Sequence, residues 1–150
     1  MSRHEDRIGK AGQEVAASAL RRLGVEEVEQ VGTPVKLIPR GKGLYQVIWG
    51  EKVSGDHRGL LPGGRGVLAE TKTILDRNLQ WSDLRPHQPG KLDAHAKLGG
   101  LSLLVWVHSS GVYVMRWPVL GFGPRKSIEP TMAGKLSAVL ESFMTEGRYE

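Results

Sequence analysis

The sequence predicts an α+β or mixed α/β domain in which helices cover one central β-sheet. Three observations support this fold class. An amphipathic helical pattern opens the chain, several β-rich segments separated by turn residues follow it, and another helical pattern closes it. A length of 150 residues suits one compact domain, so we expect a single domain over residues 1–150.

The N-terminal half is expected to form one helix and several strands. In residues 7–23 apolar side chains recur every three or four positions, and Gly24 follows as a stop signal. Residues 30–38 and 44–53 are rich in Val, Ile, Tyr and Trp and flank a glycine-containing turn, which predicts a hairpin. A breaker cluster at 62–66 precedes another β-rich segment at 67–74, which predicts a further strand.

The C-terminal half predicts a helix, a hairpin and a last helix. The pattern Leu92, His95, Ala96 and Leu98 indicates a short helix that ends at Gly99-Gly100. Residues 101–108 and 112–117 flank Ser109-Ser110-Gly111, which is a hairpin pattern. Residues 132–143 predict a helix that packs on the sheet.

Composition excludes several classes of protein. The absence of cysteine excludes a disulfide scaffold, a thiol nucleophile, a thiolate zinc site and an iron–sulfur cluster. No apolar run approaches the roughly 20 residues that cross a bilayer, and the polar N-terminus does not resemble a signal peptide. We therefore expect a cytoplasmic protein without a membrane partner.

The chain is basic, with a net charge of +5 and a pI near 9.7, and it has no basic tail. A polyanion would therefore meet a folded basic face, although net charge alone does not establish nucleic-acid binding. Lys10, Arg58 and Arg65 are candidate phosphate contacts, and the alternative is that they only solubilise the surface. Trp81 is the one tryptophan expected to be exposed, where it could stack on a base; the other three are expected in the core.

Two other kinds of site are disfavoured. The five histidines lack the His-x-x-x-His spacing that places two imidazoles on one helical face. The glycine-rich segments at 41–43 and 62–66 lack the Gly-Lys-Ser/Thr ending of a nucleotide phosphate loop.

One group of residues indicates chemistry. Glu70 and Lys72 are two positions apart in a predicted strand, so they lie on the same face. Asp56 lies fourteen positions before Glu70 across a glycine-rich turn, so a hairpin would bring the two carboxylates together. Converging carboxylates repel unless a cation neutralises them, and oxygen ligands favour Mg²⁺ or Mn²⁺. Lys72 could hold a water or stabilise a phosphate under attack; the alternative is ordinary surface charge on an exposed strand.

These residues carry a resemblance to a known family. Gly55-Asp56, thirteen intervening residues and Glu70-Thr71-Lys72 resemble the active-site motif of the PD-(D/E)xK nuclease superfamily, with Gly55 in place of the usual proline. Glu14 in the first helix resembles the additional glutamate of such nucleases; alternatively it is only a solvated glutamate of that helix. The downstream segments 81–84, 86–88 and 99–100 are similar to RecU-type Holliday-junction resolvases, and the resemblance spans roughly residues 9–117.

The resemblance implies a restriction-endonuclease-like core, a central mixed β-sheet flanked by helices, and a homodimer that makes paired incisions in branched DNA with a divalent metal. It implies that Asp56 and Glu70 bind the metal, that Glu14 and the Thr71 carbonyl complete its ligands, and that Lys72 positions or activates water. Gln88 would support the ligands or contact a phosphate; alternatively it only makes a local hydrogen bond at a helix start. A bacterial or phage-encoded origin would fit.

Two other functions stay open. The chain could be a general repair or phage nuclease of the same superfamily that acts on flaps, ends or other DNA. It could also be a non-catalytic DNA-binding module on a nuclease-like fold, because a fold can persist without its chemistry.

Overall fold

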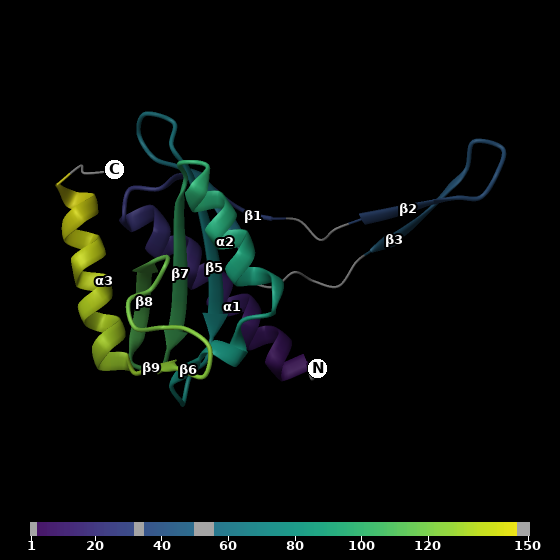
Figure 1. The fold of residues 1–150 in the computed structure, drawn as a ribbon. Helices are drawn as coiled ribbons and strands as arrows, with labels where there is room; N and C mark the ends of the chain where they lie inside the picture. The colour runs from purple at the N-terminus through teal and green to yellow at the C-terminus, as the bar shows by residue number, and fades with distance from the viewer. Residues whose placement is uncertain (1–2, 32–34, 50–55, 147–150) are drawn as a thin grey trace.

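The structure is a computed structural model that describes residues 3–31, 35–49 and 56–146. Its helices are α1 (Arg3–Arg22), α2 (His87–Lys97) and α3 (Pro130–Thr145), with a 3₁₀ turn, η1 (Trp81–Asp83), before α2 (Figure 1). All three predicted helices are confirmed, although α2 begins at His87, several residues before the apolar pattern that predicted it.

The central sheet has five strands in the order β1-β4-β5-β7-β8. They are β1 (Glu26–Gln30), β4 (Asp56–Leu60), β5 (Gly66–Thr73), β7 (Leu101–His108) and β8 (Gly111–Arg116). All neighbouring pairs are antiparallel except β5 and β7, which run parallel because η1 and α2 carry the chain back between them. The sheet is therefore mixed, and the predicted α+β class with a helix-covered central sheet is confirmed.

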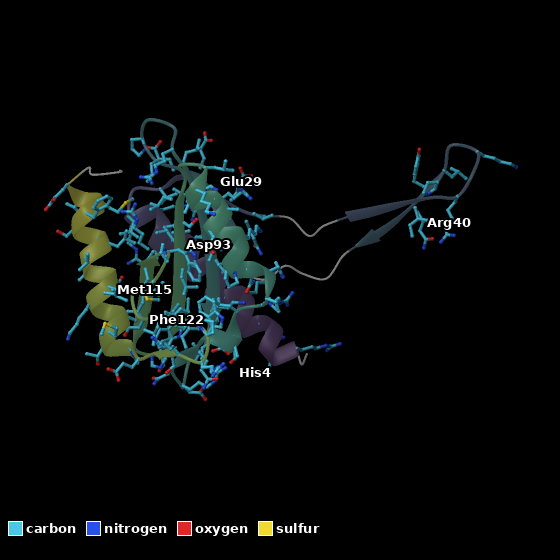
Figure 2. The ribbon with its side chains drawn as sticks, viewed as in Figure 1. His4, Glu29, Arg40, Asp93, Met115 and Phe122 are labelled. Carbon is cyan, nitrogen blue, oxygen red and sulfur yellow. The ribbon has the colours of Figure 1, made fainter. Side chains whose placement is uncertain are left out.

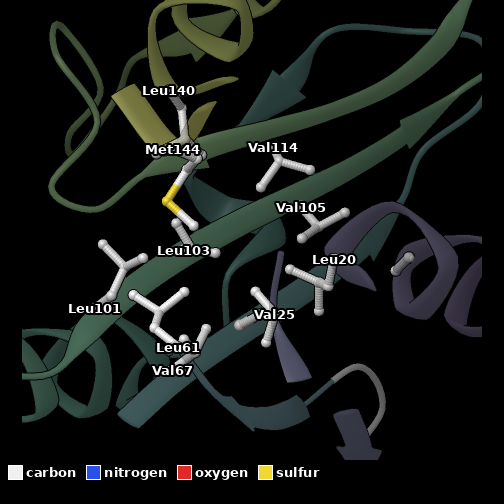
Figure 3. Packing of buried hydrophobic residues seen from close by; sticks show 12 residues of the cluster. Leu20, Val25, Leu61, Val67, Leu101, Leu103, Val105, Val114, Leu140 and Met144 are labelled. Carbon is white, nitrogen blue, oxygen red and sulfur yellow. The ribbon is translucent and has the colours of Figure 1, made fainter. Parts of the chain in front are cut away.

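Helices α1 and α2 cover opposite faces of this sheet. Ala16 and Leu20 of α1 belong to one buried cluster with Val67 and Ala69 of β5, and Figure 3 shows this cluster from close by. Leu92 of α2 belongs to a second cluster on the other face. The side chains of β5 and β7 alternate between the two clusters, as expected for strands buried on both faces.

Helix α3 runs along the β8 edge of the sheet (Figure 1). Its Leu140 and Met144 join the cluster under α1, whereas its Ala133 joins the cluster under α2. The backbone N–H of Val114 in β8 donates to the Ser137 hydroxyl at 3.1 Å. The helix therefore packs against both layers and supplies a hydrogen-bond acceptor to the edge strand.

The remaining strands form two small sheets. Strands β2 (Val35–Pro39) and β3 (Tyr45–Trp49) pair with each other, which confirms the predicted hairpin. Of the residues predicted for its strands, Gln30 belongs to β1, and 32–34 and 50–53 lie outside the described residues. Figure 2 shows this hairpin apart from the central sheet, with Arg40 near its tip. Strands β6 (Leu79–Gln80) and β9 (Ser127–Ile128) form the other pair, which the sequence did not predict.

The tryptophans depart in part from expectation. Trp106 and Trp117 are buried, as predicted, whereas the Trp49 side chain lies outside the described residues. The expectation that Trp81 is exposed is wrong. Its ring stacks on Trp117 at 5.7 Å and meets the edge of Phe122 at 5.2 Å, so aromatic packing half-buries it.

Among the described helices, none is long and apolar enough to span a membrane.

Candidate functional site

The antiparallel ladder of β4 and β5 places Asp56 directly opposite Glu70. The predicted hairpin is therefore confirmed, and its register pairs the two positions that the metal hypothesis needs. Paired positions of an antiparallel ladder belong to the same face of a sheet. The Asp56 side chain itself lies outside the described residues.

Glu70 is a carboxylate inside the protein. It lies in β5 between β4 and β7, and its side chain is 2% exposed. The amide nitrogen of Gln88 donates to Glu70 Oε1 at 2.6 Å, and Lys72 Nζ lies 3.7 Å from the same oxygen. The interpretation of Glu70 and Lys72 as surface charge on an exposed strand is therefore wrong for Glu70.

Gln88 is fixed from two sides. It sits in the first turn of α2, where it is 2% exposed. Its amide oxygen accepts the backbone N–H of Arg85 at 2.7 Å, so its nitrogen is directed at Glu70. The local hydrogen bond of the alternative interpretation is therefore present, and Gln88 also contacts Glu70, whereas its role toward a metal or a phosphate stays a prediction. The second bond follows from the first, because holding the amide oxygen orients the nitrogen.

Lys72 is also close to a carboxylate that the sequence analysis did not single out. Asp83, at the end of η1, accepts two hydrogen bonds from the Arg77 guanidinium at 2.6 and 2.8 Å and one from the Gln80 N–H at 2.8 Å. The pKa of Asp83 is lowered, mainly by the hydrogen bond from Arg77, whereas partial burial raises it. The Gln80 N–H and the charges of Arg77 and Lys72 lower the pKa further. Asp83 stands three residues after Gln80, but Gln-x-x-Asp is not the usual capping-box signature, so the sequence carried no clear signal for this residue.

Thr71 lies between the two charged residues of β5 and pairs with Val105 of β7. Among the described residues its hydroxyl is buried and has no hydrogen-bond partner. Alternation along the strand directs the Thr71 side chain away from the Glu70 face. The role predicted for Thr71 concerns its backbone carbonyl and stays a prediction.

Glu14 and Lys10 lie elsewhere. Both line a hollow of about 190 Å³ between α1 and the strands β1 and β4, together with His57. Helix α1 covers the face opposite to the one where Gln88 meets Glu70, and within the described contacts nothing joins Glu14 to Glu70. The structure thus brings Glu70, Lys72 and Gln88 together but not Glu14.

The candidate phosphate-binding arginines are separate from Glu70 as well. Arg58 is exposed on β4. Arg65 precedes β5, about 17 Å along the strand from Glu70, and donates to the carbonyls of Gly99 and Gly100 at 2.9 and 3.4 Å. Arg65 therefore fastens the β4–β5 turn to the end of α2, a role that sequence analysis did not predict.

Within the described part of the chain, no three His, Asp or Glu side chains gather closely enough to hold a metal. Asp56 is not among those side chains. A cation at Glu70 would therefore depend on Asp56 and on backbone or water oxygens.

No protein-family model matches this chain, and no curated protein matches it. Ten chains of solved structures do match. One of them, the crystal structure of SSO0001, is 14% identical with a TM-score of 0.40. The match covers 94% of this chain and 60% of that chain, so this chain spans less than two thirds of that protein.

Proposed function

We propose that the protein is a metal-dependent DNA endonuclease with a restriction-endonuclease-like core, and that four-way junctions are its substrate, as in RecU-type resolvases. The observation that carries the proposal is the buried Glu70 carboxylate, paired in register with Asp56 and 3.7 Å from the Lys72 ammonium.

Burial of Glu70 supports a functional role. Moving a carboxylate out of water costs several kcal/mol, and only a good set of partners repays this. The described partners of Glu70 are one neutral amide and one ammonium, and both approach Oε1. A cation bound through Oε2 would leave both contacts in place and offset the cost of burial further.

The residues present fit a hard divalent cation. Asp56 and Glu70 would hold Mg²⁺ or Mn²⁺, with the Thr71 carbonyl as a further oxygen ligand. When bound, the metal would polarise the phosphodiester and promote ionisation of the attacking water. Gln88 keeps the Glu70 carboxylate in one orientation, and the Lys72 ammonium would hold the water or stabilise negative charge on the phosphate.

The basic hairpin β2–β3 supports a nucleic-acid substrate. Residues 35–49 contain Lys36, Arg40 and Lys42 and no acidic residue. Cationic side chains on a projecting element neutralise phosphates without reading sequence. Lys10 of α1 and Arg58 of β4 are both exposed and would add further contacts to phosphates.

The test is cleavage of labelled substrates by the wild type, Glu70→Gln, Lys72→Ala and the control Lys97→Ala, which alters an exposed lysine of α2. Each is incubated with four-way junction, linear duplex and single strand in Mg²⁺, Mn²⁺ or chelator. We expect symmetric, metal-dependent nicking of the junction by the wild type and the control, and loss of at least about a hundredfold in the two site variants.

Other outcomes decide between the remaining functions. Cleavage of every substrate would keep the chemistry and assign a general repair or phage nuclease. Tight binding without cleavage in either metal would favour the non-catalytic module. Full activity of Glu70→Gln would refute the assigned site.

A further inference from the structure

The hollow between α1 and the strands β1 and β4 has an unusual lining. A helix that packs on a sheet normally fills the interface with apolar side chains. Ala16 and Leu20 do this over the centre of the sheet. Over β1 and β4, however, the lining of α1 is mainly polar, and a hollow of about 190 Å³ stays unfilled. The lining residues are Lys10, Gln13, Glu14, Ala17, Arg21, Val28, Gln30 and His57.

The spacing of the α1 residues creates the space. Lys10, Glu14, Ala17 and Arg21 follow one another at steps of four, three and four, so they form one stripe of the helix. The short Ala17 lies in the middle, whereas the two long cationic side chains stand at the ends, about 16 Å apart along the helix axis. Helical side chains tilt toward the N-terminus, so Arg21 leans toward the middle of the stripe, whereas Lys10 reaches the middle only by bending its flexible stem back.

The opposite wall supplies a fixed frame. His57 of β4 lines the hollow and is 3% exposed, so its ring is held in place and can report on what enters the hollow. Gln30 of β1 donates to the side-chain oxygen of Gln13 on α1 at 2.5 Å, and this bond ties the two walls together. The hollow is therefore framed by α1 on one side and by β1 and β4 on the other.

From this arrangement we infer a binding site for a phosphate group. Lys10 and Arg21 carry two positive charges against the one negative charge of Glu14, so the lining is positive overall. Phosphate oxygens accept charge-assisted hydrogen bonds from arginine and lysine side chains. The ligand is a phosphate carried by a nucleic-acid strand, either at its 5′ end or within the strand. The inference rests on the proposed nucleic-acid substrate, for which Lys10 is already a phosphate contact, and it adds Arg21 and a hollow on the face of the sheet opposite to Glu70.

The first experiment follows the His57 side-chain NMR signals while inorganic phosphate is added in the presence of chelator. We expect the His57 signals to shift and saturate, whereas those of His108, which contacts Ser110 away from the hollow, stay in place. No shift of His57 would refute the site. An equal shift of both histidines would also refute it, because it would reflect general ionic strength.

The second experiment compares variants for binding of a short 5′-phosphorylated oligonucleotide and its 5′-hydroxyl form, again with chelator. Lys10→Ala and Arg21→Ala should each weaken binding about tenfold, and Glu14→Gln should tighten it by removing a like charge. Arg22→Ala changes an exposed neighbour of Arg21 outside the hollow and should bind like the wild type.

The two oligonucleotides identify the source of the phosphate. If the wild type prefers the 5′-phosphorylated oligonucleotide and Arg21→Ala loses this preference, the hollow binds a terminal phosphate. If Arg21→Ala binds both oligonucleotides more weakly by the same factor, the hollow binds an internal phosphodiester. Binding that is unchanged in Lys10→Ala and Arg21→Ala, or reduced as strongly in Arg22→Ala, would overturn the inference. Chelator removes metal-dependent cleavage, so failure here is independent of failure of the nuclease proposal.

Discussion

Replacing Gly12 by alanine should destabilise the protein, whereas the same change at Gly9 should stabilise it. Both glycines are in α1, but Gly12 is buried against β5. A Cβ at Gly12 would lie 2.0 Å from Thr73 Oγ1 and 3.1 Å from both Thr73 Cβ and Cγ2. A Cβ at Gly9 would have no neighbour within 4 Å. The two positions therefore separate helix propensity from packing.

The magnitudes follow from these contacts. Alanine gains up to about 1 kcal/mol over glycine inside a helix. At Gly12 rotation of Thr73 could move its hydroxyl, but the Thr73 Cβ is fixed by the backbone, so α1 has to shift away from β5. Such overpacking costs roughly 1–3 kcal/mol. We expect Gly9→Ala to gain up to about 1 kcal/mol and Gly12→Ala to lose roughly 1–2 kcal/mol.

Urea unfolding of the wild type and the two variants measures these differences. The cost of Gly12→Ala is also measured in a Thr73→Ala background, where the hydroxyl and the methyl group of Thr73 are absent. In that background Gly12→Ala should lower the free energy of unfolding by less than it does in the wild type. If Gly12→Ala is as stable as Gly9→Ala, the close approach of α1 to β5 is not what requires glycine at this position.

Two further predictions concern the site. Gln88→Leu removes a hydrogen bond to a buried carboxylate. It should lower the free energy of unfolding in urea by about 2–4 kcal/mol and the cleavage rate by about 10–100-fold. The control Gln46→Leu, at an exposed glutamine, should change the free energy of unfolding by no more than about 0.5 kcal/mol. The low pKa of Asp83 beside Arg77 means that this carboxylate stabilises the fold above about pH 4 and that the gain is lost as pH falls further. In Asp83→Asn the free energy of unfolding should therefore fall less steeply below about pH 4. The difference from the wild type should be under about 1 kcal/mol, because Arg77 is half-exposed. An unchanged pH profile of the free energy of unfolding would contradict this prediction.

The sequence was informative wherever burial is periodic. The apolar spacing in α1, α3, β5 and β7 predicted these elements, because each buries a regular stripe or both faces of a strand. Strand β1 was not predicted, because its residues Glu26–Gln30 lie at the edge of the sheet and are mostly exposed. Its strand conformation comes from pairing with β4, which is a tertiary effect.

The candidate site was predictable only as far as one hairpin. The glycine-rich turn between Asp56 and Glu70 predicted that these two positions meet in a hairpin, and strand alternation placed Lys72 on the face of Glu70. The contact of Gln88 with Glu70 depends on how α2 crosses the sheet, which no local pattern encodes. Asp83 was overlooked for the same reason, since its proximity to Lys72 arises from the fold of η1.

The two borders of the central sheet have a consequence for assembly. Along β8, α3 occupies the border and Ser137 accepts the Val114 N–H. Along β1, the exposed Glu26, Glu27 and Glu29 carry like charges, and the pairing with β4 is irregular between Glu26 and Glu29. Helical cover, charge and irregular pairing all discourage strands of other molecules from adding to a sheet. Copies of this protein should therefore associate through side-chain surfaces, and the sheet should resist growth into a continuous, aggregating ribbon.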